Sequence, residues 1–452
     1  MNYSIPDNVL SVYHTLQKEG FQVYLVGGCV RDMLLQKQVK DWDMTTNATP
    51  EEILAVFPNG FYDNQFGTVG VPIVLNDEQK VVEITTYRTE RNYTDSRHPG
   101  KVAWGKTIEE DLQRRDFTIN AIALAIKDGA EEIVDPYDGQ KDVKNRIIKA
   151  VGNPNERFKE DALRLMRAIR FATQLSFTIE ENTWKAIQED AQLLPLISKE
   201  RIRDELLKIL ASDFPYEGIV LLKNAGLLQH ILPELLEGVD VSQERPGRHH
   251  TTDVFTHNMM SLKFTPSTNP IVRFATLIHD VGKPRVASKD EEGLVIFYNH
   301  EIAGAQLAYE ITNRLRFSKN DRKKVVNLIR WHMFSVDEHI TDSAVRRFIR
   351  RIGTENVKDM IDLRIGDRLG SGTQTAESWR LKLFKERIEK ELAPGPFSIN
   401  DLAIDGNDIM RELQMKPGRE VGKLLQKLFE EVDENLVLNT RDYLLTRIKE
   451  LV

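Results

Sequence analysis

Asp41 and Asp43 are separated by a single residue, and this spacing is the clearest sign of a metal site in the sequence. They flank a tryptophan in a stretch typical of a β-strand, and alternate side chains of a strand point to the same face. Two carboxylates on one face can share Mg²⁺ ions, which activate a hydroxyl and stabilise a leaving pyrophosphate. Glu83 is the predicted third ligand, because its apolar neighbours Val82 and Ile84 indicate a buried opposite face. The alternative for Glu83 is a solvated strand face.

A glycine pair precedes these carboxylates. The predicted strand Phe21–Val26 ends at Gly27 and Gly28, and Arg31 and Asp32 follow in a short predicted helix. Glycines let the backbone approach a triphosphate closely, and the amide groups that open a helix favour an anion. Gly28 and Arg31 are therefore predicted nucleotide-binding residues.

The polar run Arg114–Asn120 is predicted to open an apolar helix over residues 121–126. Arginines here can neutralise phosphate oxygens, and Asp116 can accept a hydrogen bond from a ribose hydroxyl, which would favour ribonucleotides. Arg115, Asp116 and Asn120 are the nucleotide-binding candidates in this run. For Asp116 the alternative is a helix cap.

The run Glu160–Arg170 is predicted to form one helix, with Asp161 and Arg164 on the same face. Cytosine and adenine both present an amine donor beside a ring-nitrogen acceptor, whereas uracil and guanine present the reverse. A carboxylate beside a guanidinium would therefore accept CTP and ATP and mispair with UTP and GTP. The alternative is an ordinary surface ion pair.

In this order and spacing, the segments resemble the motifs of the class II tRNA nucleotidyltransferases, which build or repair the 3′-terminal CCA of tRNA. The resemblance covers about the first half of the chain and is carried by Leu25–Asp32, Asp41–Asp43, Arg114–Ala123, Glu160–Ala172 and Ser198–Leu210.

The resemblance implies a role for each motif. The 3′ hydroxyl of tRNA would attack the α-phosphate of CTP or ATP, with Mg²⁺ as the cofactor. The residues involved would be Asp41 and Asp43 at the metal ions, Arg114, Arg115 and Asp116 at ribose and phosphate, Asp161 and Arg164 at the base, Arg167 beside that pair or at the triphosphate, and Arg170 in the same nucleotide site.

The resemblance also implies an α/β nucleotidyltransferase head with a small mixed sheet, followed by an all-α neck, body and tail. Strand patterns fade after residue 135, and Pro- and Gly-bearing stretches at 233–247, 370–372 and 394–396 indicate boundaries. The predicted domains are a head at 1–138, a base-recognising neck at 139–240, an HD-type helical domain at 241–370 and a tRNA-binding tail at 371–452. In the tail, Lys416–Lys423 opens a helix with basic residues suited to phosphate contacts.

A second group of potential metal ligands lies in the predicted helical domain. Thr276–Lys283, which contains His279 and Asp280, looks like the signature of HD-domain phosphohydrolases. Mixed imidazole and carboxylate ligands suit divalent metals that activate water for phosphate ester hydrolysis. The predicted metal ligands are His257, His279, Asp280 and Asp367, and His300 and His332 complete the pattern. This resemblance implies cyclic phosphates or phosphate-blocked tRNA ends as substrates; the alternative is a tRNA-binding body that has only kept its ligands.

Within the tRNA nucleotidyltransferase family, one segment indicates which nucleotides of the CCA end are added. Arg88–Leu112 resembles the flexible loop that enzymes adding the terminal A retain, through Arg88, Glu90, Arg91, Tyr93, Asp95, Arg97 and His98. This speaks against CC-only addition and leaves full CCA addition and A-only addition open. Bacterial poly(A) polymerases share the head motifs, but they usually carry a basic C-terminal extension that this chain lacks.

Three other classes of protein fit less well. A protein uridylyltransferase also has a nucleotidyltransferase head before an HD domain, but it would need regulatory domains where only a short tail follows. A bifunctional alarmone synthetase and hydrolase has its HD domain first. A non-catalytic RNA-binding protein would not explain the carboxylate pair.

The composition agrees with a cytoplasmic enzyme. The net charge of −7 argues against general adhesion to nucleic acid, although local basic groups remain at 141–170 and 416–427. One cysteine excludes an internal disulfide and fits a reducing compartment. We find no leader sequence and no run long enough to cross a bilayer, so no membrane partner is expected. The oligomeric state does not follow from these patterns.

Overall fold

The computed structural model describes residues 5–64, 67–75, 77–93, 99–127, 130–243, 252–334, 340–373, 375–392 and 398–451. Contacts between residues divide the chain into two compact units. The first unit contains residues 1–236 and 313–317, and the second contains residues 237–312 and 318–452. The division at 236 lies near the predicted neck boundary at 240; the other predicted boundaries stay predictions.

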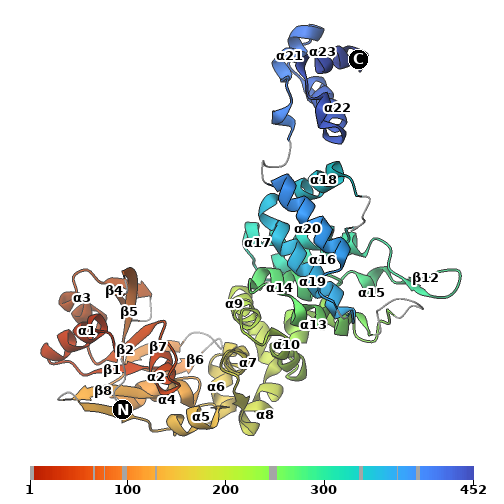
Figure 1. The fold of residues 1–452 in the computed structure, drawn as a ribbon. Helices are drawn as coiled ribbons and strands as arrows, with labels where there is room; N and C mark the ends of the chain where they lie inside the picture. Colours follow the sequence, from red (N-terminus) through yellow and green to blue (C-terminus); the bar gives the residue numbers. More distant parts are fainter. Residues whose placement is uncertain are drawn as a thin grey trace. The chain divides into compact units, whose positions relative to one another are not determined.

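The first unit begins with a seven-stranded mixed sheet in the order β3-β4-β5-β2-β1-β8-β9 (Figure 1). Strands β2 and β5 run parallel, and every other neighbouring pair is antiparallel. The strands are β1 Val23–Val26, β2 Trp42–Thr46, β3 Phe61–Asn64, β4 Thr68–Leu75, β5 Glu78–Thr86, β8 Ala123–Lys127 and β9 Ala130–Val134. Strands β6 Arg88–Tyr93 and β7 Pro99–Trp104 form a separate hairpin.

Short helices accompany the sheet: α1 Asp7–Lys18, α2 Gly28–Leu34, α3 Pro50–Val56, α4 Ile108–Gln113 and the 3₁₀ turn η1 Thr118–Asn120. The predicted strand Phe21–Val26 contains β1, and the short helix predicted after the glycine pair is α2. Val82 and Ile84 are completely buried, as predicted for the face opposite Glu83.

The predicted helix over residues 121–126 is wrong. From Ala123 to Lys127 the chain forms β8, which pairs with both β1 and β9. Its apolar run lies inside the sheet, with Ala123, Leu124 and Ala125 all buried. A short continuous apolar run fits a strand buried on both faces as well as a helix, and pairing with β1 decides between them.

The rest of the first unit is helical. It contains α5 Gly139–Asn145, α6 Pro154–Glu160, α7 Leu163–Leu175, α8 Glu181–Glu189, η2 Ala191–Leu196, α9 Lys199–Leu210, α10 Pro215–Asn224, α11 Leu228–Ile231 and α12 Pro233–Leu236, with a two-stranded ladder of β10 Ile147–Ile148 and β11 Thr178–Ile179. Helix α7 packs against α9 and α10. This packing buries almost the whole length of α7, including Arg164 and Arg170.

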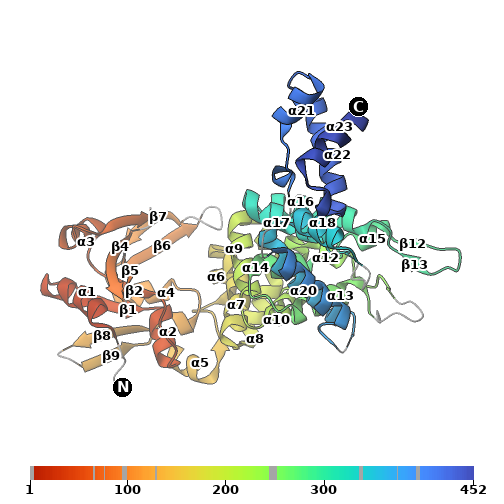
Figure 2. The same cartoon turned by 45° about the horizontal axis from the view of Figure 1, so that its top comes forward.

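The second unit is almost entirely helical (Figure 2). Its elements are α13 Val254–Phe264, α14 Pro270–Leu277, α15 Lys283–Val286, α16 His300–Arg314, α17 Lys319–Trp331, α18 Asp342–Ile352, η3 Thr354–Asn356, α19 Val357–Gly370, α20 Trp379–Leu392, η4 Ile399–Asp401, α21 Gly406–Leu413, α22 Arg419–Glu434, η5 Leu436–Leu438 and α23 Arg441–Glu450, with a small hairpin of β12 Ser288–Lys289 and β13 Val295–Ile296. An α/β head followed by a helical region is the predicted fold class, and this architecture confirms it.

Helices α21, α22 and α23 form their own apolar core, which includes Ile409, Leu428, Val432, Leu444 and Ile448. The predicted basic start of the tail helix corresponds to the beginning of α22. None of the helices in the described ranges is long and apolar enough to cross a membrane.

Candidate functional site

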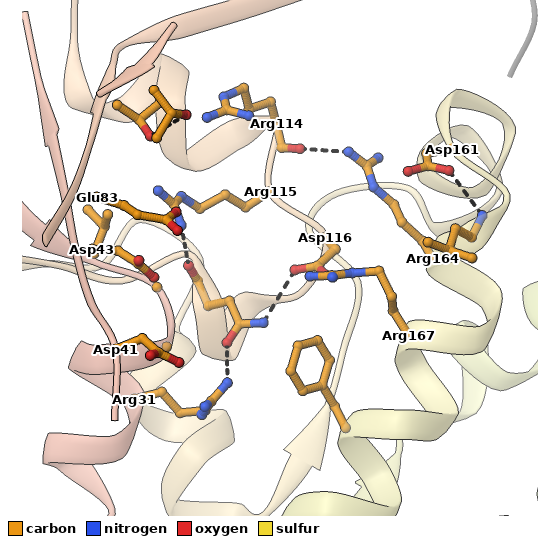
Figure 3. Close-up of a pocket in the computed structure, with 18 of the residues that line it drawn as sticks. Arg31, Asp41, Asp43, Glu83, Arg114, Arg115, Asp116, Asp161, Arg164 and Arg167 are labelled. Atoms are coloured by element: carbon orange, nitrogen blue, oxygen red, sulfur yellow. Dashed lines mark hydrogen bonds and ion pairs between the residues drawn. The ribbon is translucent and has the colours of Figure 1, made fainter. Parts of the chain in front are cut away.

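A single cavity of about 610 Å³ in the first unit collects every site residue predicted in the first half of the chain. These residues are Gly28, Arg31, Asp41, Asp43, Glu83, Arg115, Asp116, Asn120, Asp161, Arg164, Arg167 and Arg170. Figure 3 shows the three acids Asp41, Asp43 and Glu83 at one end, and Asp161 with Arg164 at the other. The sheet supplies the first group, and helices α6 and α7 supply the second.

The acidic end of the cavity is built by strand register. Asp43 of β2 lies directly opposite Glu83 of β5 in the parallel pair. Asp41 precedes β2 and follows the same alternation, so that it faces the cavity together with Asp43. Three carboxylates in one place are the oxygen ligands that hard divalent cations such as Mg²⁺ prefer, and the residues therefore fit such ions.

The electrostatics of Asp43 support this fit. Burial raises the pKa of Asp43 to about 6, with Glu83 and Asp41 adding to the rise and Arg115 and Arg31 opposing it. Like charges crowded in a buried place oppose ionisation. A bound cation would remove this penalty by neutralising the carboxylates.

Gly27 rather than Gly28 is the conformationally demanding residue of the glycine pair. Its φ is +74°, and a Cβ placed there would lie 2.8 Å from Nη1 of Arg115. Gly28 needs no such conformation, but it lines the cavity at the start of α2. The glycine turn therefore makes room for an arginine beside Asp43.

A buried aspartate that we did not predict holds the two arginines of the polar run. Asp111 in α4 accepts hydrogen bonds from Arg114 (3.0 and 2.8 Å) and from Arg115 (3.4 and 3.0 Å). Burial alone would raise the pKa of Asp111, but Arg114 and Arg115 outweigh burial and lower it. The spacing of three and four residues before the arginines is the sequence signal that could have identified Asp111.

Asp116 lies at the centre of the cavity, where the fold already supplies its partners. It accepts from the backbone amide of Phe117 (2.9 Å), from Nε of Arg167 (2.7 Å) and from Asn120 (3.4 Å). Burial would raise its pKa, but Arg167 and Arg164 lower it to about 2. Asp116 is therefore ionised at neutral pH and can accept a further hydrogen bond from a nucleotide hydroxyl.

Three guanidinium groups surround the ring of Phe171 on α7. The Cζ atoms of Arg31, Arg167 and Arg170 lie 5.6, 5.3 and 4.3 Å from the ring centroid. Arg31 also donates to the side chain of Asn120 (2.7 Å). These contacts fix a positive wall that suits a triphosphate.

The prediction that Asp161 and Arg164 lie on one helix is wrong. The chain breaks at Asp161, whose φ of −145° and ψ of 102° are extended, and α7 begins only at Leu163. The Asp161 carboxylate accepts from the amide of Leu163 (3.1 Å), the first residue of α7. Tertiary packing, rather than helical periodicity, brings both side chains into the cavity.

Each member of this pair has a separate anchor. Asp161 accepts from Nη1 (3.2 Å) and Nη2 (2.7 Å) of Arg201 on α9, a residue that we did not predict in the site although it lies within the Ser198–Leu210 motif. Arg164 donates to the carbonyl groups of Arg157 (3.0 Å) and Arg114 (2.9 Å) and to Glu160 (2.6 Å). Both groups keep unused hydrogen-bonding capacity: a lone pair on Asp161, and N–H groups on Arg164.

The loop prediction falls only partly within the described residues. Arg88 lines the cavity and donates to Thr68 (3.3 Å). Glu90, Arg91 and Tyr93 belong to β6. Asp95, Arg97 and His98 lie outside the described residues.

The second unit contains a buried histidine cluster, which we define as His257, His279, Asp280, His300, His332 and Asp367. It brings all four predicted metal ligands together. Asp280 lies between two pairs of histidines. Its Oδ2 lies 3.3 Å from Nε2 of His257 and 3.4 Å from Nε2 of His279. Its Oδ1 lies 3.3 Å from Nε2 of His300 and 3.6 Å from Nε2 of His332. Asp367 lies beside the pair His257 and His279, with its Oδ1 3.3 Å from Nε2 of His257.

Backbone hydrogen bonds orient the rings of this cluster. Nδ1 of His279, His300 and His332 donates to the carbonyl groups of Thr276 (2.8 Å), Phe297 (2.8 Å) and Ile329 (2.7 Å). Each ring then points its Nε2 atom inward, as metal-binding histidines do. The Nε2 atoms of His300 and His332 are 3.3 Å apart, close to the spacing of about 2.9–3.4 Å that adjacent ligands have when each bond is about 2.0–2.1 Å.

Glycines let the cluster converge. A Cβ at Gly370 of α19 would lie 2.3 Å from Oγ of Ser261 on α13, and one at Gly282 would lie 2.3 Å from the His300 carbonyl. The glycine at 370 therefore lets α19, which carries Asp367, pack closely against α13, which carries His257. The glycine at 282 lets the turn with His279 and Asp280 pack closely against α16.

Without a cation, a proton compensates part of the cluster's charge. Burial would lower the pKa of His257, but Asp280 and Asp367 raise it to about 9. Lys283 also donates to Asp280 Oδ2 (2.5 Å). The donor set of four imidazoles and two carboxylates fits first-row divalent metals.

Protein-family models match the chain in three places. They describe the poly A polymerase head domain over residues 23–149, the probable RNA and SrmB-binding site of polymerase A over 176–238, and a putative tRNA nucleotidyltransferase domain 2 over 288–448. Among solved structures, the Bacillus stearothermophilus CCA-adding enzyme in complex with CTP has a TM-score of 0.71 and 25% identity, covering 98% of this chain and 97% of that chain.

Relatives match along almost the whole length. The CCA-adding enzyme of Limosilactobacillus reuteri is 33% identical over 444 residues, which are 97% of this chain and 95% of that protein. The A-adding tRNA nucleotidyltransferase of Deinococcus radiodurans is 34% identical over 421 residues, 90% of each chain. Since identity of this extent combines with the head fold and the carboxylate-bearing cavity, the chain belongs to the class II tRNA nucleotidyltransferase family.

Proposed function

We propose that this chain adds the 3′-terminal CCA to tRNA from CTP and ATP. One observation carries this proposal: one cavity places a carboxylate trio and an anchored Asp161–Arg164 pair at opposite ends. The separation allows a nucleotide to present its α-phosphate to the acids and its base to the pair. The CCA-adding relatives, with matches over nearly their full length, support the same activity.

The chemistry follows from the charges in the cavity. Asp41, Asp43 and Glu83 would hold Mg²⁺, which would supply Lewis acidity at the phosphate oxygens. The tRNA 3′ oxygen forms a bond to the α-phosphorus and loses its proton, while the bond to the bridging oxygen breaks and pyrophosphate leaves. Arg115 and Arg31 lie where they can neutralise the triphosphate. Asp116 is held ionised to accept from the ribose.

Base selection would depend on the two anchored groups. Asp161 has a lone pair left for an exocyclic amine, and Arg164 has N–H groups left for a ring nitrogen. CTP and ATP match this pattern, and UTP and GTP do not. Arg201 acts as a positioning residue, because it fixes the carboxylate without needing to touch the base.

A-only addition is the second candidate, favoured by the 34% identity to an A-adding enzyme. Incubation with tRNAs that lack the whole CCA, or only its final A, separates the two activities. We expect CTP and then ATP to enter the first tRNA, ATP alone to enter the second, and addition to stop at CCA. Asp41→Ala should abolish both. Incorporation of UTP as readily as CTP would refute the base-selection scheme, and an inactive wild type would refute the enzyme assignment.

For the histidine cluster we propose metal-dependent hydrolysis of phosphate esters. The inward Nε2 atoms of His279, His300 and His332 and the shared carboxylate of Asp280 support this activity. A divalent cation in the cluster would supply Lewis acidity to a phosphate. Water would form the new bond to phosphorus, and the ester oxygen would leave with a proton.

Two measurements test this second activity. Elemental analysis of the purified chain should find a divalent metal that Asp280→Ala removes and that His230→Ala, a histidine outside the cluster, retains. Hydrolysis of a 2′,3′-cyclic phosphate should require the metal and disappear in Asp280→Ala. If the wild type binds metal but hydrolyses no phosphate ester, the cluster is structural.

A further inference from the structure

An exposed apolar patch lies on the sheet of the first unit, beside the carboxylate trio. We define the patch as Phe61 of β3, Pro72 and Val74 of β4, and Val81 of β5. Phe61 is 44% exposed, Val74 54% and Val81 41%, and Pro72 is exposed as well. The roles proposed above for the metal ions, the triphosphate and the incoming base use none of these side chains.

Strand register puts the patch on the same face of the sheet as Glu83. Gly70 of β4 lies opposite Glu83 of β5, and Pro72 lies opposite Val81. Residues that face each other across antiparallel strands share a face, and every second residue returns to it. Val74, two positions after Pro72, is therefore on this face too. Two residues of a strand span about 7 Å, so the patch begins about that far from Glu83.

Phe61 reaches this face from the neighbouring strand β3. It is the register partner of Gly70. A Cβ at Gly70 would lie 2.6 Å from Cζ of Phe61, so the ring lies over the glycine, on the side of Glu83. A side chain at position 70 would displace this ring. The glycine therefore brings a half-exposed aromatic ring onto the strand next to Glu83.

The strand order places the patch and the triphosphate groups on opposite sides of the carboxylates. In the order β3-β4-β5-β2-β1, Glu83 and Asp43 lie on the central strands β5 and β2. The glycine turn and Arg31 follow β1, whereas the patch lies on β3, β4 and the start of β5. In such a displacement the attacking and leaving oxygens are roughly in line. Because the pyrophosphate would leave toward Arg31, the attacking hydroxyl approaches from the side of the patch.

We propose that this patch binds the base of the 3′-terminal nucleotide of tRNA, the nucleotide whose hydroxyl attacks. The inference rests on the CCA addition proposed above and names the subsite for its second substrate. Stacking on apolar and aromatic side chains accepts any base, whereas hydrogen-bonding groups would select one. Successive additions present different 3′ ends, so the subsite has to accept more than one base. Gln79, opposite Val74, forms the polar border of the patch.

A double-mutant cycle between protein and RNA tests this contact. Incorporation of labelled CTP is measured on tRNA lacking CCA and on the same RNA with an abasic 3′-terminal ribose. With the wild type, we expect loss of the base to lower kcat/KM for the RNA by about 5- to 150-fold. Phe61→Ala should cause a similar loss with the intact RNA and little further loss with the abasic RNA.

The controls separate stacking from a structural effect. Phe61→Tyr should keep most of the dependence on the base. Tyr62→Ala removes a neighbour that is 46% exposed on the opposite face, and it should react like the wild type. Calorimetric titration with CTP and Mg²⁺ should give equal affinity for the wild type and Phe61→Ala, since the incoming nucleotide does not contact the patch. Val81→Ser is a second variant, and thermal melting confirms that each variant is folded.

The outcomes distinguish this inference from the function on which it rests. Equal kcat/KM for the two RNAs in the wild type, or the same base dependence in Phe61→Ala, would overturn the subsite while CCA addition stands. A wild type that adds no nucleotide to the intact RNA would refute the addition and the inference with it. A dimer in sedimentation that Phe61→Ala dissociates would overturn the subsite by assigning the patch to a second copy of the chain.

Discussion

Asp43 and Glu83 are register partners in the parallel strands β2 and β5, although 40 positions separate them in the sequence. The pairing makes Glu83 a neighbour of the aspartate pair without any local sequence motif. It also crowds negative charge at one end of the nucleotide cavity, which adds to the rise that burial causes in the pKa of Asp43.

Removing the Glu83 carboxylate should impair nucleotidyl transfer. We expect Glu83→Gln to lower kcat/KM for CTP by at least about 100-fold, because even residues that only orient metal ligands contribute about 10–100-fold. Glu78→Gln is the matched control: it lies on the same strand, is exposed and pairs with Lys80 at the surface. Near-normal transfer by Glu83→Gln, measured with labelled CTP on tRNA lacking CCA, would exclude Glu83 as a ligand.

Metal affinity of the first unit should depend on pH in the acidic range. The pKa of Asp43 is raised to about 6, so the carboxylate that must bind the cation is protonated below this pH. We therefore expect Mg²⁺ affinity to be flat above about pH 7 and to fall about tenfold per unit well below pH 6. Calorimetry in buffers of different ionisation enthalpy should detect proton release near pH 6. In Asp43→Asn this release should vanish; its persistence would assign it to another group.

Base selection should loosen when Asp161 loses its anchor. We expect Arg201→Ala to reduce discrimination between CTP and UTP by roughly 10-fold or more, because the carboxylate can then turn away from the base edge. Arg203→Ala on the same helix is the control, since Arg203 pairs with Asp204 rather than with the site. Competition between labelled CTP and UTP gives the ratio directly. A fall in activity with unchanged selectivity would make Arg201 structural only.

The helix contact behind the histidine cluster should tolerate no side chain. Gly370→Ala would place Cβ 2.3 Å from Ser261 Oγ, and such overpacking costs about 1–3 kcal/mol. We expect lower thermal stability and weaker metal retention. Gly422→Ala in α22 has open space at its Cβ and should instead stabilise by about 0.5–1 kcal/mol. Denaturant unfolding of both variants checks the pair; equal stability would show that α13 and α19 can separate without cost.

The sequence by itself determined the chemical groups and several elements. Strand alternation placed Asp41 and Asp43 on one face, and the buried Val82 and Ile84 put Glu83 on the other side of its strand. The motifs identified the resemblance to the tRNA nucleotidyltransferases. The histidines together with Asp280 and Asp367 indicated a cluster of potential metal ligands. These features are local or depend on short spacing, so periodicity and residue type suffice.

Only the tertiary structure decided how these groups meet. Residues 123–127 became a strand because β1 and β9 offered pairing partners, and the Asp161 carboxylate lies between two helices, where it accepts from the Leu163 amide and from Arg201. Arg201 joined the site only because α9 packs against α7, a helix distant from it in the sequence. A sequence pattern reports the preference of one segment, whereas these features depend on free energy gained between segments.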